Sequence, residues 1–179
     1  MEKTIFIAIL AILVFGFVLD RVLDYLNSKT WKERRPSDLS DFYSEEQYQK
    51  AKNYSKEKGK IGLLGEGFSF VITITFFVLG GFGFLNDWLG QFINNEIWLA
   101  LAFFGLLFLA SDIIGLPLGL YNTFVIEEKY GFNKTTPKIF FFDKLKGYAL
   151  SAVLGGGIMA LLLWLIMSLG QNFWWVAFL

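Results

Sequence analysis

Two carboxylates in this sequence lie inside long apolar runs, where a charged side chain is unusual. Glu66 falls near the start of the apolar run 61–85, and Asp112 falls in the second half of the run 97–121. If these runs cross a membrane, each carboxylate costs roughly 2.5–3.5 kcal/mol unless it faces water or a partner. The functional interpretation is that both line a polar cavity. The alternative is that Asp112 is hydrogen-bonded within a helical bundle and that the Glu66 side chain reaches the membrane interface.

Two adjacent glutamates, Glu127 and Glu128, follow the second of these runs and look like a pair of catalytic carboxylates. The chain, however, contains neither histidine nor cysteine. This removes imidazole bases, thiolate nucleophiles and the usual zinc ligands, so a metal ion would have to be held by oxygen atoms. We therefore predict no catalytic residue, no metal site and no bound cofactor in this chain, and we interpret the two glutamates as part of the frame around a site.

The elements that position these residues are predicted to be membrane helices. Hydrophobic residues make up 55% of the 179 residues, and 21 residues are phenylalanine, which is outside the usual composition of soluble domains. About 20 apolar residues are needed to cross a hydrocarbon core ~30 Å thick. Four runs are long enough, and they lie at about 4–26, 61–85, 97–121 and 145–169. The sequence therefore predicts an all-α, polytopic membrane bundle that forms a single transmembrane domain over residues 1–179.

A fifth apolar run begins at residue 173 and contains only seven residues, too few to cross a bilayer. A natural membrane protein seldom ends a few residues into an apolar helix. We therefore expect four complete spans plus the start of a fifth, in a chain that is a fragment of a longer protein. The alternative is a short tail at the membrane interface.

Two helix starts are predicted between the spans. Ser44 with Gln47 three residues later forms a capping-box pattern, which predicts a short soluble helix from about Glu45 to Lys58 with Gly59 as its stop. Thr136 followed by Pro137 suits an N-cap with proline at the first helical position. In that second helix, Asp143 and Lys146 have the spacing of a salt bridge.

Basic residues are concentrated in two of the connections between the spans. The connection 20–60 holds ten lysines and arginines and the connection 122–146 holds five, whereas the two connections on the other side hold none. Because cytoplasmic connections carry such an excess, we expect the N-terminus outside and both basic connections in the cytoplasm. Asp112 would then lie about 13 Å from the cytoplasmic end of its helix. Glu66 lies nearer to the same side, so a cavity lined by both would open towards the cytoplasm.

Pro117 lies five residues after Asp112 in the third span. Proline lacks a backbone N–H, so it is predicted to break the helical hydrogen-bond ladder near Ile113 and to free a carbonyl beside Asp112. Gly115 and Gly119 flank the proline at a spacing that usually indicates close helix packing.

The segment from Leu116 to Asn133, followed by a threonine and then by Phe142, Asp143 and Lys146, resembles the signature of a known family. It is similar to the N-terminal membrane domain of the type I CAAX prenyl proteases, which are integral-membrane zinc metalloendopeptidases. The resemblance extends more weakly to Pro36, Leu39 and the predicted helix in the first connection. It therefore covers nearly the whole chain.

The resemblance implies a role without catalysis. In that family the zinc motif H-E-x-x-H and a further glutamate ligand follow the fifth membrane helix on the cytoplasmic side, and the helices surround a water-filled chamber. This chain would then be the membrane domain without its zinc catalytic domain, inactive alone, building the chamber wall and supporting substrate binding. The implied chamber or substrate-supporting residues are Glu66, Asp112, Asn122, Thr123, Phe124, Glu127, Glu128, Lys129, Gly131, Phe132, Asn133 and Asp143.

The implied partners are the lipid bilayer, the chain's own C-terminal catalytic domain and a peptide or protein substrate. Nucleic acid is excluded as a partner because the formal net charge is zero, so basic residues have no free face to offer. Two functions from other classes stay open. The chain would be a small ion or proton channel or carrier if Asp112 and Glu66 serve ions, or a membrane assembly scaffold if its glycines only pack helices.

Overall fold

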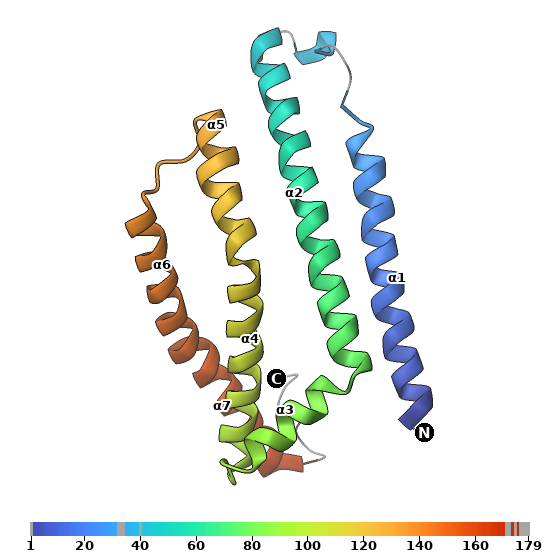
Figure 1. The fold of residues 1–179 in the computed structure, drawn as a ribbon, viewed down its shortest axis with the longest axis vertical. Coiled ribbons are helices and arrows are strands. Elements are labelled where there is room, and N and C mark those ends of the chain that lie inside the picture. Colours follow the sequence, from blue (N-terminus) through green and yellow to red (C-terminus); the bar gives the residue numbers. More distant parts are fainter. Residues whose placement is uncertain (1, 32–34, 40, 171–172, 174, 176–179) are drawn as a thin grey trace. The chain divides into compact units, whose positions relative to one another are not determined.

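The computed structural model describes residues 2–31, 35–39, 41–170, 173 and 175, and every regular element among them is helical. Seven α-helices follow one another along the described chain (Figure 1). Their bounds are α1 Glu2–Ser28, α2 Glu45–Val78, α3 Gly81–Gly90, α4 Glu96–Tyr121, α5 Glu128–Tyr130, α6 Pro137–Leu150 and α7 Gly156–Leu169. A 3-10 turn covers Ser37–Leu39, and π-helical turns cover Asn122–Glu127 and Ser151–Gly155.

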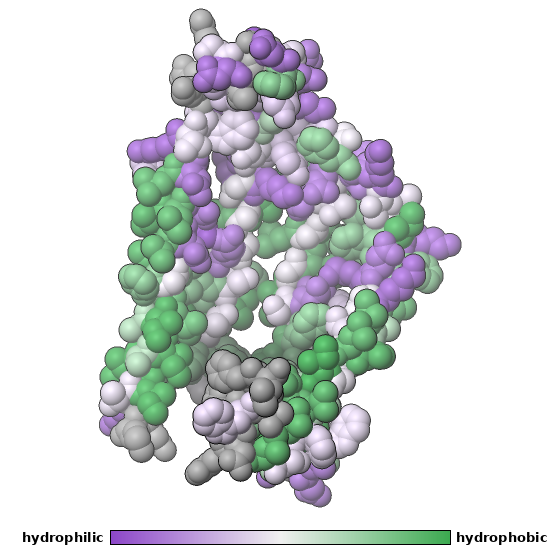
Figure 2. Space-filling model, turned by 180° about the vertical axis from the view of Figure 1, so that it is seen from behind, coloured by the Kyte–Doolittle hydropathy of each residue, from purple (hydrophilic) through white to green (hydrophobic). Residues whose placement is uncertain are grey.

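Four helical stretches of the described chain are long and apolar enough to cross a membrane. They are Lys3–Ser28, Glu45–Val78, Glu96–Tyr130 and Pro137–Leu169, the last two continuing through the π-helical turns. No residue in their most apolar windows is buried within the described chain, and Figure 2 shows hydrophobic side chains over much of the visible surface. The predicted all-α polytopic membrane protein is confirmed. The predicted fifth span lies outside the described residues except for Phe173 and Trp175.

The second span differs from the prediction at both ends. The capping box is present, because the Ser44 N–H donates to Gln47 Oε1 at 2.8 Å and the Gln47 N–H donates to Ser44 Oγ at 3.1 Å. The helix that it starts does not stop at Gly59, however, and the predicted soluble helix is continuous with the span in α2. A glycine costs about 1 kcal/mol in a helix interior, which is less than the cost of leaving backbone groups unpaired beside an apolar run.

The turn after α2 also comes before Leu85, the predicted end of this span. The α2 helix ends at Val78, and Gly80 takes a left-handed conformation with φ of 73° before α3 begins. Glycine adopts this conformation at no steric cost, so it turns the chain between two helices. Pro117, in contrast, lies inside α4 without ending it.

The described chain groups into two compact units, of which the first comprises residues 1–78 and 118–133. Within it α1 and α2 pack antiparallel. The rings of Phe6 and Phe77 stack with centroids 4.8 Å apart, and those of Phe17 and Phe70 stack at 4.0 Å. In the same unit α2 also packs against the π-helical turn Asn122–Glu127.

The second unit comprises residues 79–117 and 134–179. The Asn95 side chain caps α4 by accepting from the N–H groups of Ile97 at 3.0 Å and Trp98 at 3.1 Å. The predicted Thr136 cap of α6 is confirmed, with Pro137 at the first turn and Thr136 Oγ1 accepting from the Ile139 N–H at 3.3 Å. These caps fix where the helices of the unit begin.

Candidate functional site

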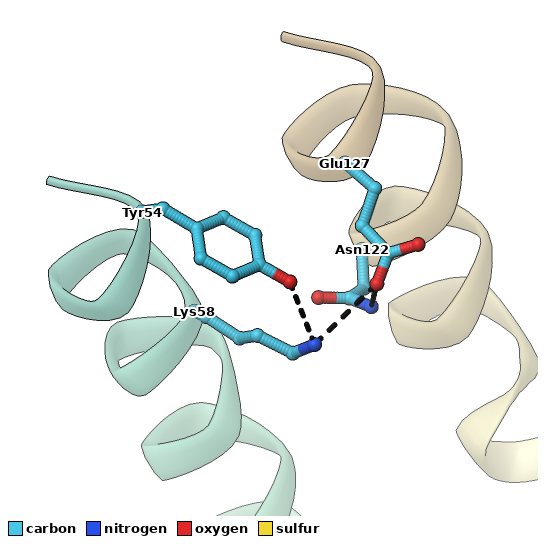
Figure 3. Close-up of polar contacts among 4 residues, drawn as sticks. All are labelled: Tyr54, Lys58, Asn122 and Glu127. Carbon is cyan, nitrogen blue, oxygen red and sulfur yellow. Dashed lines mark hydrogen bonds and ion pairs between the residues drawn. The ribbon is translucent and has the colours of Figure 1, made fainter. Parts of the chain in front are cut away.

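A polar cluster in the first unit joins α2 to the π-helical turn Asn122–Glu127. The Lys58 ammonium donates to Tyr54 Oη at 2.9 Å and to Glu127 Oε1 at 3.4 Å, and the Asn122 amide donates to the same Oε1 at 3.2 Å (Figure 3). The Glu127 side chain is 27% exposed and that of Lys58 is 49% exposed. Tyr54 and Lys58 have the i, i+4 spacing that places two side chains on one face of a helix. The cluster is therefore built from one face of α2 and one turn of the facing segment.

The π-helical turn explains how Asn122 and Glu127 meet. They are five residues apart, a separation that places two side chains well away from each other on an α-helix with 3.6 residues per turn. A π-helical turn closes i to i+5 instead, so positions five apart come together. The turn thus allows Asn122 to brace the Glu127 carboxylate that faces Lys58.

A second ion pair and an aromatic cluster continue the same contact. The Lys129 ammonium lies 2.5 Å from Glu57 Oε1. The Tyr54 ring packs against the ring of Tyr130 with centroids 5.3 Å apart and against that of Phe132 at 4.9 Å. Tyr130 is buried. Charges of opposite sign and apolar rings therefore hold α2 against residues 127–132 along their shared face.

Gly131 turns the chain back at the end of this contact. Its φ is 76°, and the N–H of Gly131 donates to the carbonyl of Glu128 at 3.0 Å while that of Phe132 donates to Glu127 at 2.8 Å. This is a Schellman ending, which needs a left-handed residue that is usually glycine. The Asn133 amide then donates to Glu128 Oε2 at 2.9 Å. The turn thereby returns Phe132 to the aromatic cluster.

The two intramembrane carboxylates lie in different units, and each meets a cation. In the first unit Glu66 pairs with Arg21 of α1, which also lies 2.9 Å from Asp24. In the second unit Asp112 accepts two bonds from the Lys144 ammonium at 2.6 and 2.7 Å, and one from the Tyr148 hydroxyl. These bonds agree with the second interpretation of Asp112, in which its carboxylate is hydrogen-bonded within a helical bundle.

The remaining predicted residues are placed as follows. Thr123 and Phe124 are half-buried in the π-helical turn between Asn122 and Glu127. The Asp143 carboxylate lies 3.5 Å from the Lys146 ammonium on an exposed part of α6, as predicted from their spacing. The structure therefore brings together the predicted residues from 122 to 133, whereas Glu66, Asp112 and Asp143 have separate surroundings.

Sequence reasoning did not predict which cations, tyrosines and further carboxylate contact the predicted residues. They are Arg21, Tyr54, Glu57, Lys58, Tyr130, Lys144 and Tyr148. The i, i+4 spacing of Tyr54 with Lys58, and of Lys144 with Tyr148, marks two polar helix faces and was available in the sequence. The partners were not, because Lys58 and Glu127 are 69 positions apart.

The side chains that the structure describes do not form a group suited to a catalytic metal. Among the described side chains, no three from histidine, cysteine, aspartate and glutamate gather closely enough to hold a metal ion. Zinc is bound mainly by imidazole nitrogen and thiolate sulfur, and the sequence contains neither.

Comparisons with known proteins identify what the chain is similar to. Residues 24–179 match the family described as "CAAX prenyl protease N-terminal, five membrane helices". The "CAAX prenyl protease 1 homolog" of Oryza sativa subsp. japonica is 31% identical over 171 residues, covering 91% of this chain and 40% of the relative. The homolog of Mus musculus is 31% identical over 187 residues, covering 99% of this chain and 39% of the relative.

A relative in Schizosaccharomyces pombe, "Probable CAAX prenyl protease 1", is 30% identical over 155 residues, covering 79% of this chain and 33% of its own length. The crystal structure of S. mikatae Ste24p superposes with a TM-score of 0.83 at 29% identity, covering 93% of this chain and 40% of that one. The chain thus spans 33–40% of the length of these relatives. This chain belongs to the CAAX prenyl protease family, of which it is an N-terminal membrane domain.

Proposed function

We propose that this chain is the non-catalytic membrane part of a zinc metalloendopeptidase, that it forms part of the wall of an intramembrane chamber, and that it supports the binding of a peptide substrate. The observation that carries the proposal is the family match over residues 24–179, in a chain that spans about two fifths of its relatives. Zinc and its ligands belong to the catalytic domain, where the metal supplies a Lewis acid and an activated water. The residues of this chain would contribute binding and positioning.

The cluster around Glu127 is where we place the support for the substrate. Glu127 Oε1 accepts from both Lys58 and Asn122, whereas Oε2 accepts from none of the described residues. The carboxylate is half-buried and its orientation is held from two sides, so Oε2 is an acceptor available to a peptide N–H. A carboxylate acceptor forms a stronger hydrogen bond than a neutral one.

The orientation that we propose follows from the distribution of charge. The N-terminus would lie outside, and the basic connections 20–60 and 122–146, with fifteen of the sixteen lysines and arginines, would lie in the cytoplasm. The Glu127 cluster would then face the cytoplasm, on the side where the family's catalytic domain is expected.

The alternative of an ion or proton carrier is less consistent with the contacts. Glu66 pairs with Arg21, and Asp112 pairs with Lys144. Arginine stays protonated at all physiological pH values. A carboxylate held by such a partner is already neutralised and is poorly suited to bind and release a cation.

Photolabelling of the purified chain tests the proposed function. The probe is a farnesylated peptide ending in a CAAX sequence, with a benzophenone side chain beside the farnesylated cysteine. We expect labelling within residues 118–133 that excess unlabelled peptide prevents. Glu127→Gln should weaken the apparent affinity by about tenfold, since a hydrogen bond to a charged group contributes about 1.5–3 kcal/mol. Measurement is by mass spectrometry of labelled fragments over a peptide titration.

The matched control is Asp87→Asn, which removes an exposed carboxylate of α3 in the second unit. It should leave labelling unchanged. Two results would show that this cluster does not support the substrate. One is labelling that excess unlabelled peptide does not reduce, and the other is equal labelling of Glu127→Gln and the unaltered chain.

A further inference from the structure

Two contacts between α2 and the facing segment lie on either side of the π-helical turn, and they are unequally spaced along the two segments. At one end, a Cβ at Gly65 would lie 3.2 Å from Leu118 Cδ1. At the other end, the rings of Tyr54 and Tyr130 are 5.3 Å apart. Eleven steps separate residues 65 and 54 on α2, whereas twelve separate 118 and 130 on the facing segment. The facing segment therefore contains one residue more than α2 between the same two contacts.

The π-helical turn lies inside this interval and can contain the additional residue. A π-helical turn closes i to i+5 where an α-helix closes i to i+4, so it accommodates one more residue in a single turn. If residues 122–127 formed an α-helix instead, everything after them would rotate by about 100°. Glu127, Lys129 and Tyr130 would then leave the face that meets Lys58, Glu57 and Tyr54.

Asn122 is the side chain that spans the turn. Its amide donates to Glu127 Oε1 at 3.2 Å, from the first residue of the turn to the last, and the bond is partly buried. The same oxygen accepts from Lys58 of α2. Asn122 thus acts on α2 only through Glu127, by fixing which way the carboxylate points.

We infer that the turn Asn122–Glu127 contains one surplus residue relative to α2, and that Asn122 is a positioning residue that directs the Glu127 carboxylate to Lys58. The consequence for peptide binding rests on the proposed function, because Oε2 is the acceptor assigned to the substrate there. The register and the positioning of Glu127 do not rest on it.

The inference that the turn contains a surplus residue predicts that one residue can be removed from it without loss of the contacts that follow it. Val125 is the most suitable choice, being 45% exposed. Its deletion brings Asn122 and Glu127 to i, i+4, the spacing at which side chains meet on an ordinary α-helix. An alanine inserted after Val125 adds a second surplus residue and should rotate the later residues by about 100° away from α2.

Cysteine cross-linking measures this directly, since the chain has no cysteine of its own. Glu57→Cys with Lys129→Cys reports contact beyond the turn, and Gly65→Cys with Leu118→Cys reports contact before it. With a short bifunctional thiol reagent, we expect the later pair to cross-link in the otherwise unaltered chain and in the Val125 deletion, but not in the alanine insertion. The earlier pair should cross-link in all three. Deletion of Thr123, in the same turn, serves as a second variant with one residue fewer. If neither deletion allows the cysteines at 57 and 129 to cross-link, the inference is overturned, whether or not those at 65 and 118 still do.

The inference that Asn122 positions Glu127 predicts that Asn122→Ala weakens the contact between the Glu127 carboxylate and the Lys58 ammonium. We expect faster acylation of the Lys58 amine relative to Lys56 of the same helix, and no further increase from Asn122→Ala when Glu127→Gln is already present. Asn122→Gln keeps an amide donor and should restore part of the protection. Equal acylation in Asn122→Ala and the unaltered chain, or an effect that persists in the Glu127→Gln background, would overturn the role of Asn122. Neither assay uses a peptide, so photolabelling can fail while both succeed.

Discussion

Three carboxylates at or within the spans each meet a cation from a different helix. Glu66 meets Arg21, Asp112 meets Lys144, and Glu127 meets Lys58. Removing a charge from water is costly, and a partner charge with additional hydrogen bonds offsets that cost. Asp112 has both, because the Tyr148 hydroxyl also donates to it. Loss of one partner should therefore harm such a site more than loss of the whole pair.

At the residue scale we predict that Lys144→Met destabilises the chain by about 1–2 kcal/mol, because it leaves the half-buried Asp112 carboxylate without its cation. The double variant Lys144→Met with Asp112→Asn should lose less, since a neutral amide tolerates the site and can accept from Tyr148. Thermal unfolding in detergent micelles measures both.

The exposed pair of Asp143 and Lys146 provides the control. Replacing both with Asn and Met should change stability by less than about 0.5 kcal/mol, as exposed ion pairs contribute little. A double variant at 112 and 144 that is no more stable than Lys144→Met alone would contradict the account of the Asp112 site.

The sequence located the carboxylates of these sites but not their partners. Asp112 and Glu66 stand out because acids are rare in apolar runs, and Asn122 and Glu127 belong to a recognisable motif. Lys144 was indistinguishable from its neighbours in a basic connection. Its role depends on how α6 packs on α4 32 positions away, which local pattern does not encode.

At the scale of elements, helix starts were predicted better than helix ends. Ser44 and Thr136 cap helices through bonds between near neighbours, so their patterns determine the local structure. Gly59 and Gly80 are both glycines near the end of a predicted helix, yet only Gly80 breaks one. The difference lies in the next residues, because Gly80 is followed closely by Gly81 and Gly83, and several glycines together lower the helix propensity more than the single Gly59 does. No sequence pattern predicted the π-helical turns. The surplus residue of the turn Asn122–Glu127 is recognised only when its contacts with α2 are known.

We predict that Gly131→Ala destabilises the first unit by roughly 1–2 kcal/mol, because a residue with a Cβ is strained at the φ of 76° found there. Gly131→Asn should cost less, since asparagine visits this conformation more readily. Chemical or thermal unfolding of the three proteins gives the comparison.

Gly147 is the matched glycine, because it lies in the interior of α6 with no atom within 4 Å of a built Cβ. Gly147→Ala should be neutral or stabilise by up to about 1 kcal/mol. An equal effect of alanine at both positions would mean that the left-handed conformation of Gly131 is not what limits substitution.

At the scale of the whole molecule, the composition was sufficient to predict a multi-pass membrane protein, which the four long apolar helices and the family match confirm. Hydropathy works at this scale because every spanning backbone must satisfy its own hydrogen bonds, which leaves helix as the simple solution. The assignment to an N-terminal membrane domain of a protease family came from the resemblance in the segment 116–133, not from composition. Orientation stays a prediction that rests on the asymmetry of basic residues.

Cysteine labelling tests that orientation. In sealed inside-out vesicles, Ser37→Cys and Lys138→Cys should react with a membrane-impermeant maleimide, whereas Asn94→Cys should react only in right-side-out vesicles. All three side chains are exposed, so each can react once the reagent reaches it. Reaction of Ser37→Cys and Asn94→Cys from the same side would show that the charge asymmetry does not determine the topology.

The order in which the paired charges are synthesised bears on how the protein enters its membrane. Each of the four spans is long and apolar enough to cross a membrane, so we expect each to pass from the translocation channel into the lipid without help from another span. Arg21 is made before Glu66, so the cation is already present when that carboxylate is synthesised. Asp112 precedes Lys144 by 32 residues, so it reaches the membrane ahead of its partner. We therefore expect insertion of the third span to depend on its surrounding leucines and phenylalanines until α6 follows it into the membrane.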